Sequence, residues 1–102
     1  MVIELNDNNF ENEVIKAKEI VLVDFFATWC NPCKIMSPVI DEIAKSSIPN
    51  VKVGKVDVDE SSELAEKYEI MSIPTIAIFK NGEIVKSFLG VTDKEDIIKE
   101  LK

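Results

Sequence analysis

Continuous apolar runs alternate along this chain with segments whose apolar residues recur every three to four positions. The run from Ile20 to Phe26 shows no alternation and holds one carboxylate, Asp24. Such a run predicts a strand that is covered on both faces, as in a parallel sheet. Four further segments are predicted to be strands: Ile3 to Leu5, Val51 to Val58, Ile76 to Phe79 and Glu83 to Leu89.

Helical spacing is clearest between Ile35 and Lys45, where Pro38 is expected to kink the helix because it removes a backbone donor. Three shorter helices are also predicted. Their apolar residues are Phe10, Val14 and Ile15 in the first, Leu64, Ala65 and Tyr68 in the second, and Ile97, Ile98 and Leu101 in the third. Capping chemistry is expected from Asn8 with Glu11, from residues 59–62, and from Thr92 with Glu95.

These elements follow one another in the order β-α-β-α-β-α-β-β-α. Strands joined through helices are expected to pair in parallel, and the turn at Asn81-Gly82 adds an antiparallel hairpin. The prediction is therefore an α/β fold formed by residues 1–102 as a single domain. It has a central five-stranded mixed sheet with four helices covering its two faces.

The amino-acid composition excludes several classes of function. The net charge is −7, which argues against a nucleic-acid or acidic-lipid surface. There is no arginine, which removes bidentate phosphate clamps, although codon bias explains that absence equally well. There is no histidine, which excludes Ser-His-Asp and Cys-His catalysis within one chain and any histidine-ligated metal site. Residues 1–6 lack the features of a targeting segment, and the apolar runs are too short to span a membrane. The expected location is therefore the cytoplasm.

The only two cysteines, Cys30 and Cys33, stand where the predicted central strand becomes a helix. Their spacing places both sulfurs on one helical face, near enough to bond. The positive end of the helix dipole favours a thiolate at Cys30, while Cys33 is expected to be less exposed and more thiol-like. Pro32 fits the first helical turn. A structural disulfide or half of a metal site is the alternative, and the flanking Trp29 and the lack of other ligands disfavour it.

Asp24 is unusual because an ionised carboxylate inside an apolar strand is costly unless it is paired. One interpretation is a residue at a strand end that reaches solvent. The other is a buried carboxylate, partly protonated, that accepts the proton of the less exposed thiol. Lys55 interrupts a neighbouring strand and is the natural partner, although a lysine there can equally be solvated.

Ile73-Pro74-Thr75 directly precedes a predicted buried strand. Pro74 can simply start that strand, or it can follow a cis peptide bond that shapes a loop. The residues leave both possibilities open. Gly90 is most simply a strand terminator or the lead-in to the following helix.

The segment Val23 to Lys34, which reads Val-Asp-Phe-Phe-Ala-Thr-Trp-Cys-Asn-Pro-Cys-Lys, resembles the active-site signature of the thioredoxin family. The resemblance extends over essentially the whole chain. It also includes Pro38, Lys55, Ile73-Pro74-Thr75, Lys80-Asn81-Gly82-Glu83 and Gly90.

The resemblance implies the thioredoxin fold, with Pro74 in cis, and dithiol–disulfide exchange on protein substrates. By match to the family pattern, Cys30 is the nucleophile, Cys33 resolves the mixed disulfide, and Asp24 with Lys55 assists proton transfer. The surface that receives a substrate segment is expected to comprise Trp29, Asn31, Pro32, Ile73, Pro74, Gly90 and Val91.

The chain departs from the family pattern in three places. Asn31 stands where glycine is usual, Phe26 where a further tryptophan is common, and Met71-Ser72 replaces a pair that usually ends in glycine. Because Asn31 lies between the two cysteines, it is expected to alter the redox potential and the choice of reductase.

The functional prediction is a monomeric protein-disulfide reductase that serves as a general cytoplasmic electron donor. It is expected to carry no cofactor and no metal and to bind neither nucleic acid nor membrane. A thioredoxin reductase is expected to supply its electrons. The alternatives are a binding module in which two chains share a metal or Fe–S cluster, and a structural subunit that uses the fold as an interaction surface. A net oxidant or isomerase would differ in redox potential and compartment.

Overall fold

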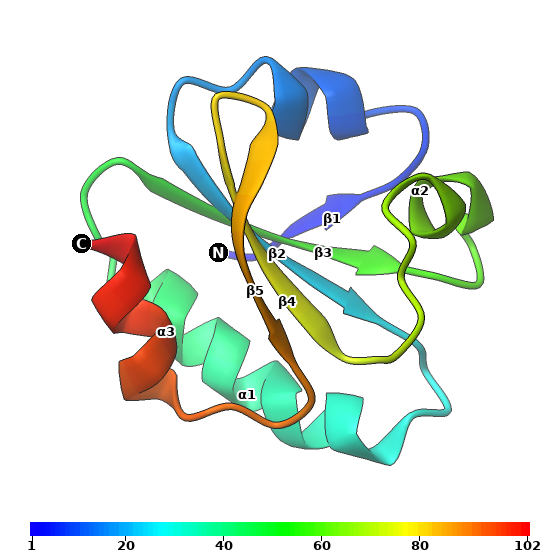
Figure 1. The fold of residues 1–102 in the computed structure, drawn as a ribbon. Helices are drawn as coiled ribbons and strands as arrows, with labels where there is room; N and C mark the ends of the chain where they lie inside the picture. Colours follow the sequence, from blue (N-terminus) through cyan, green and yellow to red (C-terminus); the bar gives the residue numbers. More distant parts are fainter.

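The structure is a computed structural model that describes residues 1–102, and it holds one five-stranded sheet with helices on both faces (Figure 1). The predicted order of elements is confirmed. The elements are β1 (Ile3–Leu5), η1 (Glu11–Ile15), β2 (Ile20–Phe26), α1 (Asn31–Lys45), β3 (Val51–Asp57), α2 (Ser62–Lys67), β4 (Thr75–Lys80), β5 (Glu83–Leu89) and α3 (Lys94–Leu101). The first helix is a single π-helical turn, shorter than its sequence pattern suggested.

The sheet has the strand order β1-β3-β2-β4-β5. Strand β3 pairs in parallel with both β1 and β2, whereas β4 runs antiparallel to β2 and β5 runs antiparallel to β4. The mixed sheet is therefore confirmed, but the expectation that all helix-joined strands pair in parallel is wrong for β4. Residues 58–74 stay near the carboxyl end of β3, so the chain re-enters the sheet where β2 ends and runs back along it. Thr75 at the start of β4 accordingly lies opposite Phe25.

Two apolar layers enclose the sheet, as the unalternating sequence of β2 predicted. Figure 1 shows α1 and α3 on one side of the sheet, with α2 and the blue helix η1 on the other. Leu22 faces the first layer together with the buried residues Met36, Ile40, Ile43, Ile97 and Leu101. Val21, Val23 and Phe25 face the second layer together with Phe10, Val14 and Leu64. The central strand is thus covered on both faces, which leaves Asp24 in a largely apolar setting.

The hairpin at Asn81-Gly82 is confirmed, with φ of 54° at Asn81 and 80° at Gly82. The predicted capping boxes are not formed. Before η1, the Asn6 side chain accepts the backbone N–H groups of Asn8 and Asn9, so Asn8 does not cap that helix. Asn6 and Asn9 instead accept each other's backbone N–H groups, the reciprocal pattern of a capping box, in the turn that leads into η1.

The other two predicted caps fail in the same way. The Thr92 hydroxyl donates to the Gly90 carbonyl instead of capping α3. Before α2, the Asp57 carboxylate accepts the N–H groups of Asp59 and Glu60, and Ser61 makes no side-chain cap.

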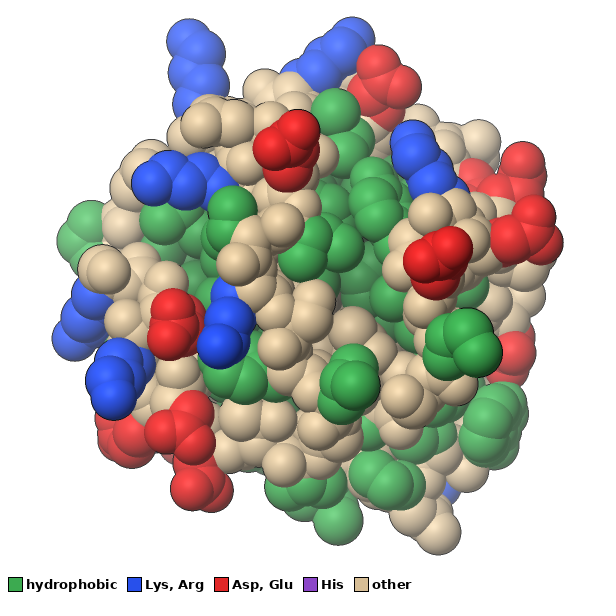
Figure 2. All heavy atoms as spheres, viewed as in Figure 1, with side chains coloured by type: hydrophobic (Ala, Val, Ile, Leu, Met, Phe, Trp, Pro, Cys, Tyr) green, Lys and Arg blue, Asp and Glu red, His purple; other side chains and the backbone are tan.

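The surface mixes charge and apolar side chains. Figure 2 shows apolar side chains reaching the surface between interspersed lysines and carboxylates on the face viewed in Figure 1. The large hydrophobic side chains that are exposed anywhere on the molecule are Met1, Trp29, Ile35, Met71, Ile84, Val85, Leu89 and Val91. No helix in the structure has both the length and the apolar character needed to cross a membrane.

Candidate active site

The two cysteines lie at the amino end of α1 and form a disulfide, with their Cα atoms 5.2 Å apart. Cys30 is the N-cap residue, and its sulfur accepts the backbone N–H of Cys33 at 3.2 Å. Pro32 occupies the first turn, where its missing N–H leaves no helical bond unmade. The predicted placement of a dithiol at a strand-to-helix junction is confirmed. This end of the helix stabilises negative charge on the Cys30 sulfur.

The predicted difference in exposure between the two cysteines is not observed. Cys30 is 5% exposed and Cys33 is 4% exposed, so both are buried in the oxidised protein. They pack with Ala27 and with the half-buried side chains of Phe26, Val58 and Ile73. Residues distant in sequence therefore cover Cys30, which helical position alone did not indicate.

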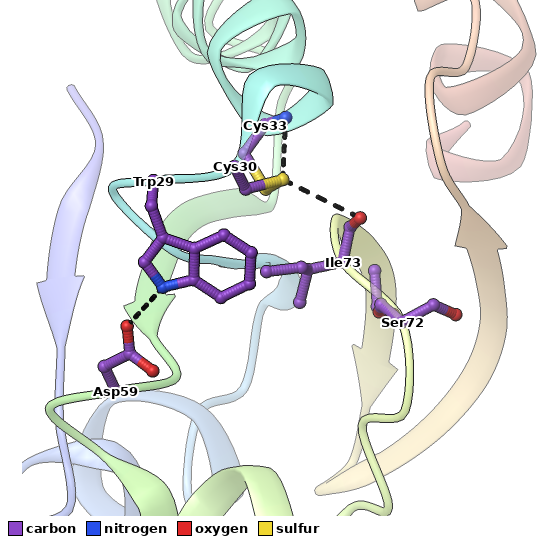
Figure 3. The surroundings of a disulfide bond; sticks show 7 residues. Trp29, Cys30, Cys33, Asp59, Ser72 and Ile73 are labelled. Carbon is purple, nitrogen blue, oxygen red and sulfur yellow. Dashed lines mark hydrogen bonds between the residues drawn. A yellow bond between two sulfur atoms is a disulfide. The ribbon is translucent and has the colours of Figure 1, made fainter.

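The two sulfurs nevertheless have different neighbours. The Cys30 sulfur lies 3.8 Å from the carbonyl oxygen of Ile73 (Figure 3). Cys33 instead lines a shallow pocket of about 210 Å³ together with Ala27, Lys34 and Ser37. Cys30 thus lies against the loop before β4, while Cys33 faces a pocket between the end of β2 and the first turns of α1.

Trp29 is 67% exposed and lies beside the disulfide. Its indole N–H donates to the Asp59 carboxylate at 2.8 Å, and Figure 3 shows the Ile73 side chain pointing toward the indole ring. Sequence reasoning missed Asp59 and assigned it to a surface turn. A signal was present, because Trp29 and Asp59 each follow a neighbouring parallel strand closely, and the carboxyl ends of parallel strands meet at one sheet edge.

The loop before β4 reaches the dithiol because β4 is antiparallel to β2. The Ile73-Pro74 peptide bond is cis, as the family resemblance implied. The Gly90 N–H donates to the Pro74 carbonyl at 2.8 Å, and Gly90 has a φ of 80°. Val91, next in the chain, is exposed. The structure therefore brings Ile73, Pro74, Gly90 and Val91 to the same end of the sheet as the cysteines.

The loop after β5 is also attached to α1. The Thr92 N–H donates to the sulfur of Met36 at 3.3 Å. Met36 is fully buried one helical turn beyond Cys33. Its sequence pattern indicated only a packing residue, because a thioether in an apolar stripe has no feature that reveals a backbone donor nearby.

Asp24 is buried, with 4% of its surface exposed, and its Oδ1 atom has no hydrogen-bond partner. Burial raises the pKa of Asp24 from its usual 3.8 to about 7, and the positive charge of Lys55 partly opposes that rise. The interpretation of Asp24 as a residue that reaches solvent at a strand end is excluded. At neutral pH the group is close to half-protonated, which suits a proton acceptor.

Lys55 lies opposite Asp24 in the register of β2 and β3. The ammonium group is 5.7 Å from the centroid of the Phe26 ring. The ion pairs of the structure are made by Lys16, Lys52 and Lys94. Lys55 is therefore an electrostatic neighbour of Asp24 and not a contact ion-pair partner.

The remaining predicted residues, Asn31 and Pro32, are exposed at the start of α1. No group of three or more histidine, cysteine, aspartate or glutamate side chains is arranged to hold a metal ion.

Comparison with known proteins agrees with this geometry. A family model described as Thioredoxin matches residues 1–102. The chain is 44% identical over 96 residues to the thioredoxin of Buchnera aphidicola subsp. Acyrthosiphon pisum (strain APS), which covers 94% of this chain and 89% of that protein. It is 44% identical over 99 residues to the thioredoxin of Rickettsia bellii (strain RML369-C), covering 97% of this chain and 94% of that protein.

A longer relative is also similar. Over 101 residues the chain is 40% identical to a protein of Mycobacterium leprae (strain TN) named bifunctional thioredoxin reductase/thioredoxin. The match covers 99% of this chain and 22% of that protein.

Proposed function

The chain belongs to the thioredoxin family, and from that premise we propose how its individual residues carry out thiol–disulfide exchange. The chain is a thiol–disulfide oxidoreductase of the protein-disulfide reductase type. The observation that supports the residue roles best is the Cys30–Cys33 pair at the amino end of α1, on a strand whose interior holds Asp24.

Cys30 is proposed as the nucleophile. In the reduced protein its thiolate is stabilised by the Cys33 N–H and by the helix dipole. The thiolate attacks one sulfur of a substrate disulfide, so one S–S bond breaks and a mixed disulfide with Cys30 forms. The leaving substrate sulfur departs as a thiolate and takes up a proton.

Cys33 is proposed to resolve the mixed disulfide. Asp24 in its ionised form accepts the Cys33 proton, and the resulting thiolate attacks the Cys30 sulfur. The Cys30–Cys33 bond forms and the second substrate thiolate leaves. Two electrons pass from the dithiol to the substrate, and the product is the oxidised state seen in the structure.

Substrate is proposed to lie on the exposed face around the dithiol. Trp29 and Val91 supply exposed apolar surface, and the Ile73 carbonyl faces the Cys30 sulfur. A partner segment placed there would contact the full proposed set: Trp29, Asn31, Pro32, Ile73, Pro74, Gly90 and Val91.

We further propose that residues 1–102 act as a monomeric single domain in the cytoplasm. A thioredoxin reductase would return two electrons to the disulfide after each cycle. The Mycobacterium leprae relative supports this assignment, because its name joins a reductase and a thioredoxin in one protein. The net charge of −7 supports protein partners over nucleic acid.

The residue roles are tested by trapping. Cys33→Ser is expected to accumulate a mixed disulfide with a model protein disulfide through Cys30, because no second thiol resolves it. Cys30→Ser is expected to trap none, and the double variant controls for non-covalent association. The measurement is mass spectrometry of the non-reduced adduct; equal trapping by the two single variants would reverse the assignment. Turnover with candidate reductases tests the electron donor separately.

A further inference from the structure

A row of three charged residues crosses the parallel half of the sheet. Glu4 on β1 lies opposite Lys55 on β3, and Lys55 lies opposite Asp24 on β2. Partners in register on parallel strands project from the same face of the sheet. The next row, formed by Leu5, Val56 and Phe25, is buried in the layer under η1 and α2, so the charged row projects toward the α1 side.

The side chains of this row become more buried from β1 at the sheet edge to β2 at its centre. Glu4 is exposed at the sheet edge, Lys55 is half-buried, and Asp24 is buried. Glu4 and Lys55 also line one open pocket of about 280 Å³, together with Phe26, Asp57 and Glu60. Lys55 therefore lies between acidic residues at the sheet edge, with none of which it forms an ion pair, and the buried residue Asp24 on its inner side.

We propose that Glu4 is a positioning residue for the proton transfer at Asp24. The Glu4 carboxylate attracts the Lys55 ammonium toward the sheet edge and away from the buried carboxyl. In consequence, Asp24 retains a proton at higher pH than it would with Lys55 free to approach. The inference rests on the proposed role of Asp24 as the acceptor of the Cys33 proton.

Neutralising Glu4 should lower the pKa of Asp24 in two ways. Removing the Glu4 charge takes away a negative charge from a residue whose backbone lies two strand spacings, roughly 10 Å, from that of Asp24, and it also frees Lys55 to move inward. Both changes favour the ionised form of Asp24. Other charged groups nearby are few: Asp57 and Glu60 act on Lys55 in the same sense as Glu4, α1 contributes Lys34 in the pocket beside Cys33, and β4 places uncharged Ile76 opposite Asp24.

The test is a direct titration of Asp24 in the oxidised protein by carbon NMR of its carboxyl group. Glu4→Gln is expected to lower the pKa of Asp24 by about half a unit at low salt. Glu83→Gln is the matched control, because it neutralises an exposed carboxylate at the other edge of the sheet. It is expected to leave the pKa of Asp24 unchanged. In a Lys55→Met background, the effect of Glu4→Gln is expected to fall to less than half its size, since Lys55 transmits most of it.

A Glu4→Gln shift no larger than that of Glu83→Gln would overturn the proposal. A shift of equal size with and without Lys55 would also overturn it, because Glu4 would then act on Asp24 directly and not by positioning Lys55. The pH midpoint of the resolving step, measured by rapid mixing, is expected to move down by the same amount as the pKa. If the pKa moves and this midpoint does not, Asp24 is not the acceptor of the Cys33 proton; the effect of Glu4 on the Asp24 pKa would stand, but its part in the resolving step would fail together with that proposed role.

Discussion

One row of residues crosses the entire sheet and changes character halfway. In the parallel half it consists of Glu4, Lys55 and Asp24, and in the antiparallel half it continues as Ile76 and Phe88. Charge therefore extends inward from one edge of the sheet and ends at Asp24. Beyond that point the same row is apolar and belongs to the core under α1 and α3.

The two halves of the sheet contribute different groups to the region around the dithiol. The parallel half places a titrating carboxyl in the strand that leads to the cysteines. The antiparallel half places Pro74 before β4 and Gly90 after β5, joined by a hydrogen bond of 2.8 Å. We infer that proton transfer depends on the first half and substrate contact on the second. Substitutions should therefore change pH dependence in one half and KM in the other.

The largest effect is expected from Asp24→Asn on stability. The pKa of Asp24 is about 7 in the folded protein and 3.8 when the group is exposed. Between pH 4 and pH 7 the unfolded chain therefore loses this proton before the folded protein does, and the free energy of unfolding falls as the pH rises. Above pH 7 this decrease is constant at about 4 kcal/mol. The variant is expected to gain about 2 to 4 kcal/mol of unfolding free energy at pH 8 and almost nothing at pH 4, measured by urea unfolding of the oxidised protein.

The matched control is Ile76→Val, in the same row one strand further on. Removing one buried methylene there should cost about 1 kcal/mol at both pH values. An equal gain for Asp24→Asn at pH 4 and pH 8 would show that burial does not raise the pKa of Asp24, and the contrast between the two halves would fail.

Much of this architecture could be predicted because the relevant signals are local. Uninterrupted apolar residues marked β2 as a doubly covered strand, and the carboxylate inside it marked Asp24 as unusual. The spacing of Cys30 and Cys33 before an amphipathic pattern placed the dithiol at a helix start. Asn81-Gly82 identified the hairpin, because both residues tolerate positive φ.

The features that were missed depend on contacts between distant segments. The direction of β4 is set by where the chain re-enters the sheet, which its own apolar pattern does not encode. The burial of Cys30 depends on Ile73, and the role of Asp59 depends on Trp29. The capping residues were wrong because asparagine, aspartate and threonine can bond within their own turns as readily as to a helix.

A smaller effect, confined to the antiparallel half, is expected from Met36→Leu. The change keeps the buried volume but removes the acceptor of the Thr92 N–H, which loosens the loop after β5. Losing one such bond is worth about 1 kcal/mol, so KM for a protein disulfide should rise about fivefold while kcat stays the same. Hydrogen exchange at the Thr92 amide should also become faster.

Two comparisons separate this effect from general damage to the core. Ile40→Leu makes a similar change one turn further along the same buried face of α1 and removes no acceptor. The rate with a small-molecule disulfide reports on the dithiol without the loop. If Ile40→Leu raised KM as much, or if the small disulfide slowed equally, Met36 would be only a packing residue.

The smallest effect on KM is expected from Asp59→Ala, because Asp59 follows a strand of the parallel half but contacts the proposed substrate surface. Asp59 follows β3 in the parallel half, yet its carboxylate accepts the Trp29 indole N–H at 2.8 Å on the proposed substrate surface. Because this bond is exposed, Asp59→Ala should raise KM only two- to threefold, about 0.5 kcal/mol, and lower the fluorescence anisotropy of the only tryptophan. Asp59→Asn keeps an oxygen acceptor without the charge. If it behaves like the wild type, the hydrogen bond orients the indole; if it matches Asp59→Ala, the negative charge acts on the partner directly, and the parallel half also contributes to recognition.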